Sequence, residues 1–194
     1  MSLKQLLDQR PILVAIAGPN GAGKSSFYES HLAPSGLDFL NADVLAEALA
    51  IDAYAAANLA NELRRQRIEH RESFIFETVF SDPVGDKVEF LKSAEKIGYC
   101  VVLIFIGIDN TALSSDRVAM RVSQGGHDVP AQKLVERYPR AMKNLKRALA
   151  ELSNVLVHDH SDLEIGYRLV AMKNNGQGIE LHEPTPDWLR ALLP

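Results

Sequence analysis

The strongest chemical signal in the sequence is a glycine-rich segment that ends in lysine and serine. The pattern G-x-x-x-x-G-K-[ST] is matched in full by Gly18-Pro19-Asn20-Gly21-Ala22-Gly23-Lys24-Ser25, and a second serine, Ser26, follows it. Glycines let consecutive backbone N–H groups turn toward phosphate oxygens without a clash from Cβ. The lysine ammonium suits the β- and γ-phosphates of a nucleoside triphosphate, and the serine hydroxyl suits Mg²⁺. We therefore predict that this segment binds a nucleoside triphosphate, with Ser25 as a Mg²⁺ ligand.

Two further pairs of polar residues follow short apolar runs. Asn41 and Asp43 come after one such run, and Glu77 and Thr78 end another. Because parallel strands end at a shared ligand-binding edge, we expect both pairs beside the phosphate-binding segment. There Asp43 is suited to accept the proton of an attacking hydroxyl, or else to stabilise a helix N-terminus. Glu77 is suited to orient a substrate hydroxyl or a Mg²⁺-bound water, or else to cap a turn.

A basic segment supplies candidate arginines. Residues 111–150 hold eight basic and three acidic side chains, a net charge of +5 within a chain of net charge −4. Arg117 and Arg121 lie four residues apart and project from one face of a predicted helix. Glycines at 125 and 126 interrupt that helix before a second basic helix begins near Pro130. This pattern predicts a helical lid whose two arginines contact the transferring phosphoryl group, with an exposed basic helix pair as the alternative.

Other residues of the basic segment have less specific interpretations. Arg137 and Arg140 flank Pro139 and are suited to extend the arginine clamp, and Pro139 predicts a kink or a break in its helix. We expect Lys143, Lys146 and Arg147 to form a solvated face.

The sequence leaves several acidic and histidine residues without an assigned role. Asp109 resembles the acidic end of a metal-binding strand, although Gly107 and Ile108 extend the chain before it. His127 has no cysteine or second histidine at the spacing of a metal site. For the segment His158 to His160, which follows the last predicted strand of the parallel sheet, a loop is favoured over a metal site.

Short apolar runs alternate with helical patterns, which indicates an α/β fold. The predicted strands are 12–17, 38–40, 73–77, 100–107 and 154–158, and predicted helices begin near 24, 43, 54 and 82. An apolar stripe at 138, 142, 145, 149 and 152 predicts one more helix. We predict a P-loop NTPase three-layer fold with a mostly parallel sheet of about five strands and a helical lid. We treat residues 1–194 as one domain, with the lid at about 111–150 and a C-terminal hairpin and short helix at about 166–194.

Composition excludes several classes of protein. A single cysteine in 194 residues rules out a disulfide framework, and nothing indicates secretion, so we expect a cytoplasmic protein. The strongest apolar run, Val101 to Ile108, is far shorter than the roughly 20 residues of a membrane helix. The mildly acidic total argues against nucleic-acid binding.

Taken together, these motifs resemble those of the zeta-toxin-like P-loop kinases, especially the short bacterial members. The matching segments are GPNGAGKS (18–25), NAD (41–43), SFIFETVFS (73–81), RVAMRVSQGGHDVP (117–130) and RYPRAMKNL (137–145). The resemblance implies that Lys24 and Ser25 bind ATP and Mg²⁺, that Asp43 is the base, and that Arg117 and Arg121 clamp the γ-phosphate. It implies that Asn41, Glu77 and Thr78 line the acceptor site.

The resemblance also suggests partners. It implies a small-molecule acceptor with a hydroxyl group, with UDP-N-acetylglucosamine as one candidate, and an antitoxin protein as a candidate partner. The chain lacks the long C-terminal extension of the larger toxins, and residues 79–82 hold no arginine where those toxins are expected to have one. Kinase chemistry tolerates these differences better than substrate identity does.

Two alternative functions fit the phosphate-binding segment. One is a nucleoside or nucleotide kinase, and the other is an ATPase or GTPase that acts as a switch. The chain has no N-K-x-D guanine motif, and Ser123 to His127 only resembles the L-S-G-G-Q motif of transport ATPases. The paired arginines favour a kinase.

Overall fold

A seven-stranded β-sheet forms the centre of the protein. The computed structural model describes residues 2–125 and 129–193. The strands are β1 (Ile12–Ala17), β2 (Asp38–Leu40), β3 (Phe74–Thr78), β4 (Cys100–Gly107), β5 (Val155–Asp159), β6 (Arg168–Lys173) and β7 (Glu180–Leu181). Their spatial order is β2-β3-β1-β4-β5-β6-β7. The prediction of an α/β fold with a mostly parallel sheet is confirmed.

The predicted number of about five strands is wrong. Strands β1 to β5 run parallel to one another and correspond to the five predicted apolar runs. The other two strands, β6 and β7, belong to the C-terminal segment and extend the sheet antiparallel from β5. A hairpin can stand apart from a sheet or extend it, and its sequence pattern is the same in both cases.

Eight α-helices surround the sheet within the described residues. They are α1 (Leu3–Leu7), α2 (Lys24–Phe27), α3 (Ala42–Leu49), α4 (Ala53–Glu69), α5 (Asp86–Lys96), α6 (Thr111–Ser123), α7 (Ala131–Glu151) and α8 (Asp187–Arg190). Helix α7 is continuous through Pro139, so the predicted break is absent; Pro139 is exposed, which leaves its side of the helix open to water. Helix α6 ends at Ser123, and Gly125 follows with a left-handed φ of 89°, as the predicted interruption requires; Gly126 and His127 lie outside the described residues.

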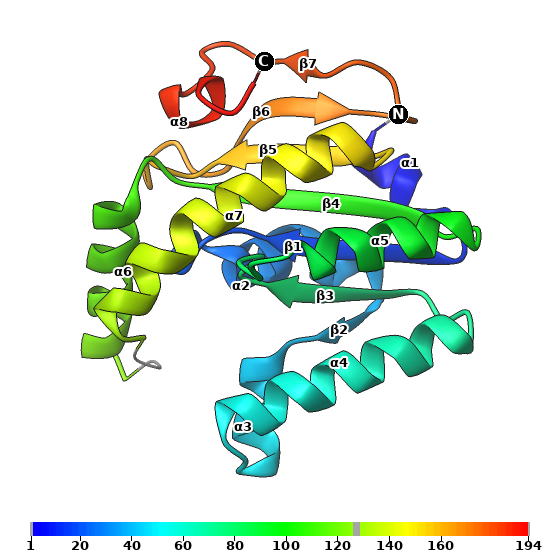
Figure 1. Ribbon diagram of the computed structural model, residues 1–194, viewed down its shortest axis with the longest axis horizontal. Coiled ribbons are helices and arrows are strands. Elements are labelled where there is room, and N and C mark those ends of the chain that lie inside the picture. Colours follow the sequence, from blue (N-terminus) through cyan, green and yellow to red (C-terminus); the bar gives the residue numbers. More distant parts are fainter. Residues whose placement is uncertain (1, 126–128, 194) are drawn as a thin grey trace.

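The two faces of the sheet bury separate apolar clusters. On β1, Leu13, Ala15 and Ala17 join the cluster formed with α5, α7 and α8, which also takes in Ala60 of α4. The alternate β1 residues face a second cluster formed with α1 and α2. Figure 1 shows α5 and α7 in front of the sheet and α2 behind it. Because both faces of the sheet are covered, the central strands consist of continuous runs of apolar residues.

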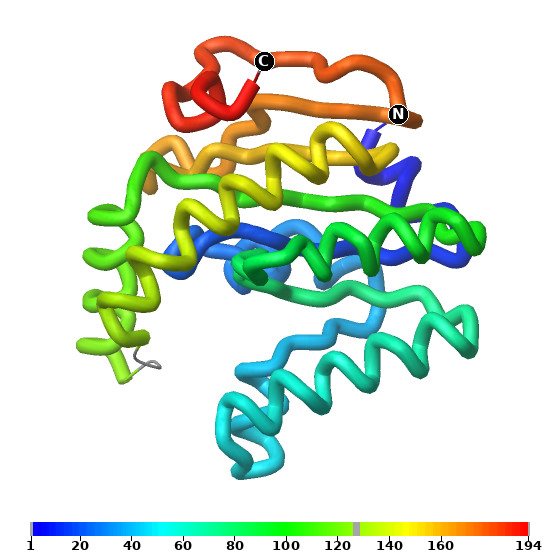
Figure 2. Tube along the Cα trace, in the orientation of Figure 1, coloured from blue at the N-terminus to red at the C-terminus, as the bar shows by residue number. Residues whose placement is uncertain are grey.

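The carboxyl ends of the parallel strands point toward α3 and α6. Figure 1 shows these ends on the left, with α6 and the beginning of α7 beyond them and α3 below. The tube in Figure 2 shows both chain ends at the top of the view, near β6 and β7. The polar residues at the ends of β2 and β3 lie together at this carboxyl edge of the sheet. In the part of the chain that the structure describes, no helix combines the length and apolar character needed to cross a membrane.

Trp188 docks the C-terminal segment onto the sheet. Its ring packs over Gly107 at the end of β4, and its indole N–H donates to Asp159 Oδ1 over 3.0 Å. A Cβ at Gly107 would overlap the Trp188 ring. A glycine is required here by the close approach of the indole.

We predict that Gly107→Ala destabilises the protein through this overlap. The expected loss in the free energy of unfolding is about 1–3 kcal/mol, as for overpacked cores, measured by urea unfolding. In a Trp188→Leu background the same substitution should cost less than half as much, because the overlapping ring atoms are gone. An equal cost in both backgrounds would contradict this explanation.

Candidate active site

The glycine-rich segment forms the turn between β1 and α2. Helix α2 begins at Lys24, so its first backbone N–H groups face the turn. Gly23 precedes the helix with a left-handed φ of 89°, and a Cβ there would lie 2.8 Å from the His160 ring and the Tyr167 hydroxyl. A Cβ at Gly18 would overlap the carbonyl oxygen of Ile106. Both glycines are therefore needed for the path of the loop as well as for access by phosphate.

Lys24 is buried beside a carboxylate. Its side chain is only 7% exposed, donates to the carbonyl oxygen of Pro19 over 3.1 Å, and lies 3.7 Å from Glu77 Oε1. Burial lowers the pKa of Lys24, whereas the negative charges of Glu77 and Asp43 raise it and Arg121 lowers it. Asp43, Glu77 and Arg121 are therefore all near enough to Lys24 to influence its charge.

Glu77 connects three elements of the site. Its Oε2 accepts hydrogen bonds from Ser25 Oγ over 2.8 Å and from Asn41 Nδ2 over 3.0 Å. Strand β3 lies directly beside β1, and Glu77 pairs in register with Ile16. A hydroxyl and a carboxylate oxygen at this distance suit Mg²⁺, which prefers oxygen ligands and retains several waters. Asp109, the other acidic strand-end candidate, lies elsewhere and accepts a hydrogen bond from Ser161 Oγ over 3.0 Å.

Asn41 and Asp43 are positioned by the beginning of α3. Asn41 is the N-cap of this helix, and its Oδ1 accepts the backbone N–H of Asp43 over 2.8 Å. The same side chain donates to Glu77, so the cap and the carboxylate hold each other in place. Asp43 stands in the first turn of α3 and lines the same cavity as Glu77.

A cleft of about 400 Å³ opens beside these residues; we call it the central cleft. Its walls come from the phosphate-binding loop, from α3 and α4, from the chain after β3, and from α6 and α7. The charged side chains that line it are Asp43, Arg64, Glu77, Asp82, Lys87, Arg121, Lys133 and Arg137. Thr78 also lines it, and its Oγ1 accepts the backbone N–H of Phe80 over 3.1 Å.

The two arginines predicted to act together line different cavities. Arg121 lines the central cleft. Arg117 donates instead to the carbonyl oxygens of His160 and Ser161, over 2.7 and 2.9 Å. It lines a second cavity of about 490 Å³ with Asp109, Leu113, Asp116, Met120, Ser161, Asp162, Leu163 and Glu164. Burial lowers the pKa of Arg117, and nearby tyrosine and aspartate residues raise it.

His160 and Tyr167 contact backbone carbonyls of the phosphate-binding loop, a role that the sequence did not reveal. The His160 Nδ1 lies 2.8 Å from the carbonyl oxygen of Ala22, and the Tyr167 hydroxyl donates to that of Gly23 over 2.6 Å. The two rings are stacked with centroids 4.0 Å apart. Burial lowers the pKa of His160. The expected loop begins only at His160, because His158 and Asp159 belong to β5.

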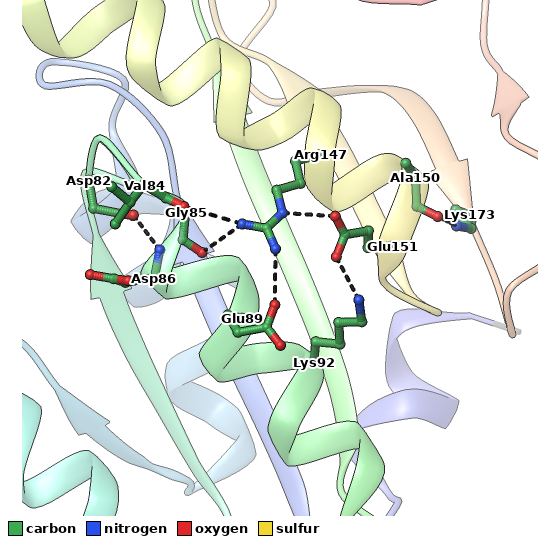
Figure 3. Close-up of polar contacts among 10 residues, drawn as sticks. All are labelled: Asp82, Val84, Gly85, Asp86, Glu89, Lys92, Arg147, Ala150, Glu151 and Lys173. Atoms are coloured by element: carbon green, nitrogen blue, oxygen red, sulfur yellow. Dashed lines mark hydrogen bonds and ion pairs between the residues drawn. The ribbon is translucent and has the colours of Figure 1, made fainter.

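Helix α7 fixes the chain that follows β3. The buried Asn144 donates to the carbonyl oxygens of Phe80 and Asp82, both over 2.9 Å. Figure 3 shows Arg147, one turn further on, between the carbonyls of Val84 and Gly85 and the carboxylates of Glu89 and Glu151. The prediction of a purely solvated face is therefore wrong for Arg147. The wall of the central cleft that follows β3 is therefore held by α7.

Comparisons with known proteins agree with this architecture. A family described as "AAA domain" matches residues 13–148. No curated protein sequence matches the chain. A solved structure described as the AvrRxo1-ORF1:-ORF2 complex with ATP matches with a TM-score of 0.63 and 17% identity, covering 92% of this chain and 63% of that chain. The chain thus spans less than two thirds of that protein.

Two other solved structures share the fold. One is a putative kinase from Chloroflexus aurantiacus, with a TM-score of 0.57, 16% identity, and coverage of 80% of this chain and 91% of that chain. The other is described as the PezAT chromosomal toxin-antitoxin system of Streptococcus pneumoniae, with a TM-score of 0.56, 12% identity, and coverage of 78% and 69%. At identities this low, the TM-scores show a shared fold and nothing more.

We predict that Asn144→Ala loosens the chain after β3. Two carbonyl oxygens lose their donor, so the free energy of unfolding should fall by about 1–3 kcal/mol, measured by urea unfolding. Hydrogen exchange should increase in residues 79–85. Lys143→Ala, at the exposed neighbouring position, is the control and should change neither measurement. Unchanged exchange in Asn144→Ala would show that the loop is held by other contacts.

We predict that His158 makes the fold sensitive to mild acid. Its ring lies 5.1 Å from that of Phe27, its Nδ1 is buried without a partner among the described residues, and burial lowers its pKa to about 4 from 6.5. The unfolded chain therefore binds a proton below pH 6.5 that the folded chain accepts only near pH 4. The free energy of unfolding should decrease across this window, by at most about 1.4 kcal/mol per pH unit.

Urea unfolding between pH 7.5 and 4.5 measures this slope. His158→Gln keeps a polar group near the Nε2 position and removes the titration, so its slope should be shallower. His70→Gln, at an exposed position, is the control. A slope in His158→Gln equal to that of the unsubstituted protein would contradict the prediction.

Proposed function

Because the chain belongs to the AAA domain family, whose match includes the phosphate-binding loop, we propose that it is an ATP-dependent phosphotransferase. It transfers the γ-phosphoryl group of ATP to a hydroxyl of a small molecule in the central cleft. The observation that supports this most is the position of Asp43. It shares the central cleft with Glu77 and Arg121, and it lies close enough to influence the buried Lys24.

The size of the central cleft favours an acceptor larger than water. A volume of about 400 Å³ is within the range of small-molecule sites, and the walls come from elements outside the phosphate-binding loop. A switch ATPase needs only a water molecule next to the γ-phosphate. The cleft therefore supports the kinase over the switch.

The second cavity suits the rest of the nucleotide. It lies along Arg117, which is bonded to the chain at His160, and His160 in turn contacts the phosphate-binding loop. Leu113, Met120 and Leu163 provide apolar surface for a base. We propose that Arg117 acts at the nucleotide, while Arg121 acts at the transferring phosphoryl group.

The residues of this chain divide the chemistry as follows. Lys24 and the loop N–H groups bind the β- and γ-phosphates. When the nucleotide is bound, its phosphates replace Glu77 as the negatively charged partner of the Lys24 ammonium. Ser25 and Glu77 fit a Mg²⁺ ion, which would neutralise charge on the phosphate oxygens.

At the acceptor, Asp43 takes the proton of the attacking hydroxyl as the new O–P bond forms and the bond to the ADP oxygen breaks. Arg121 stabilises the charge that develops between them.

The acceptor itself stays a prediction. UDP-N-acetylglucosamine is one candidate because of the sequence resemblance, and nucleosides and nucleotides are the alternative. An antitoxin partner also stays a prediction. It is supported by the fold shared with the structure described as a toxin-antitoxin system. Purification of the chain with its neighbouring gene product tests it.

We predict that Asp43→Asn and Lys24→Met both abolish acceptor phosphorylation. Loss of the base should lower kcat about 10²–10⁴-fold, and loss of the ammonium should lower it about as much. Glu47→Gln, at an exposed position on the same helix as Asp43, is the matched control and should retain activity. The assay incubates the protein with ATP, Mg²⁺ and a panel of UDP-sugars, nucleosides and nucleotides, and identifies products by mass spectrometry. ADP release without a phosphorylated acceptor, unchanged in Asp43→Asn, would replace the proposal with simple hydrolysis.

A further inference from the structure

Two cations share one neutral partner in the central cleft. Arg64 on α4 is only 7% exposed, and it donates through Nη2 to the Asn61 Oδ1. Lys87 on α5 donates to the same oxygen over 3.2 Å. The guanidinium carbon of Arg64 lies 4.9 Å above the ring of Phe76, which fixes the plane of the fork. Both cations line the cleft that also contains Asp43.

Neither charge is neutralised by a carboxylate. Across residues 2–125 and 129–193, no ion pair involves Arg64 or Lys87. Burial, together with the smaller effect of the neighbouring Arg65, lowers the pKa of Arg64 to about 10. Burial and the charge of Arg64 also lower the pKa of Lys87, whereas Asp82 and Asp86 raise it from a distance. A buried cation is costly unless an anion accompanies it.

We propose that Arg64 and Lys87 bind an oxyanion of the acceptor, either a phosphate or a carboxylate. The acceptor is then an anionic hydroxy compound, with its anion at this pair and its reacting hydroxyl at Asp43. This inference rests on the proposed function for the identity of the ligand as a phosphoryl acceptor. The binding of an oxyanion at the pair is testable without it.

The chemistry of the pair matches this ligand. A guanidinium presents a planar fork of donors that fits two oxygens of a phosphate or carboxylate, and an ammonium adds a point charge. On the opposite wall, Lys133 and Arg137 of α7 line the same cleft and add positive charge. Packing on Phe76 accounts for the position of Arg64, but it does not account for a second cation that reaches the same amide oxygen.

Anion binding at the pair can be separated from anion binding at the phosphate-binding loop. The full-length protein is first saturated with a non-hydrolysable ATP analogue and Mg²⁺. Inorganic phosphate or malonate is then titrated at constant ionic strength, and thermal denaturation is followed. We expect saturable stabilisation, with the preferred oxyanion giving the lower apparent Kd.

Matched variants assign the effect to the pair. Arg64→Gln and Lys87→Met should each weaken the anion at least tenfold, and Arg64→Lys should restore part of the affinity. Lys96→Met at an exposed position on α5 should change nothing, and Arg65→Gln on α4, whose side chain is 71% exposed, should change the affinity far less than the pair variants do. Lys87→Met keeps the test valid if the buried Arg64 cannot be replaced without unfolding. No saturable effect of either anion, or an equal loss in the control variants, would overturn the proposal.

The experiments distinguish failure of the phosphotransferase proposal from failure of the anion-site proposal. If the ATP analogue causes no stabilisation, the phosphotransferase proposal is contradicted. The anion titration is then repeated on Lys24→Ala, and dependence on Arg64 and Lys87 would still support the pair. In the acceptor assay, Arg64→Gln should raise KM for an anionic acceptor at least tenfold while changing kcat less. Efficient phosphorylation of a neutral polyol or nucleoside, unaffected by Arg64→Gln, would overturn the assignment of acceptor class.

Discussion

The buried ammonium of Lys24 determines how the site is assembled. Since burial disfavours the charged form, the lysine needs a carboxylate nearby, and Glu77 supplies it at 3.7 Å. Glu77 is itself held by Ser25 and Asn41, so one charge pair joins the phosphate-binding loop, β3 and α3. Asn41 also caps α3, and that cap fixes the turn in which Asp43 stands. Asp43, the proposed base, is therefore oriented by the same network that supplies the negative charge beside Lys24.

Strand order makes this network possible. Because β3 lies directly beside β1, Glu77 ends its strand next to the turn that begins at Gly18. Helix α7 then links the two sides of the central cleft. Its first half contributes Lys133 and Arg137, and its second half holds the chain after β3 through Asn144 and Arg147. A single long helix thus sets the distance between the basic wall and the chain that follows β3.

Much of this arrangement follows from local sequence, and the remainder depends on contacts between distant segments. The apolar runs and the glycine-rich motif predict the parallel strands and the phosphate-binding loop, because burial on both faces leaves a pattern within each strand. The spacing of Arg117 and Arg121 predicts a shared helix face but not which cavity each lines. The stack of His160 on Tyr167 and the pairing of Arg64 with Lys87 join residues from separate elements, so no local pattern indicates them.

The connection between β2 and β3 has a consequence for how specificity can change. Helices α3 and α4 pack mainly on each other, and they form one continuous excursion between two neighbouring strands. This excursion carries Asp43, Asn61 and Arg64, whereas the loop that holds the phosphates lies in an earlier part of the chain. Replacement of residues 41–72 as a cassette would exchange one wall of the central cleft, the one beside Asp43, and leave the phosphate-binding loop intact.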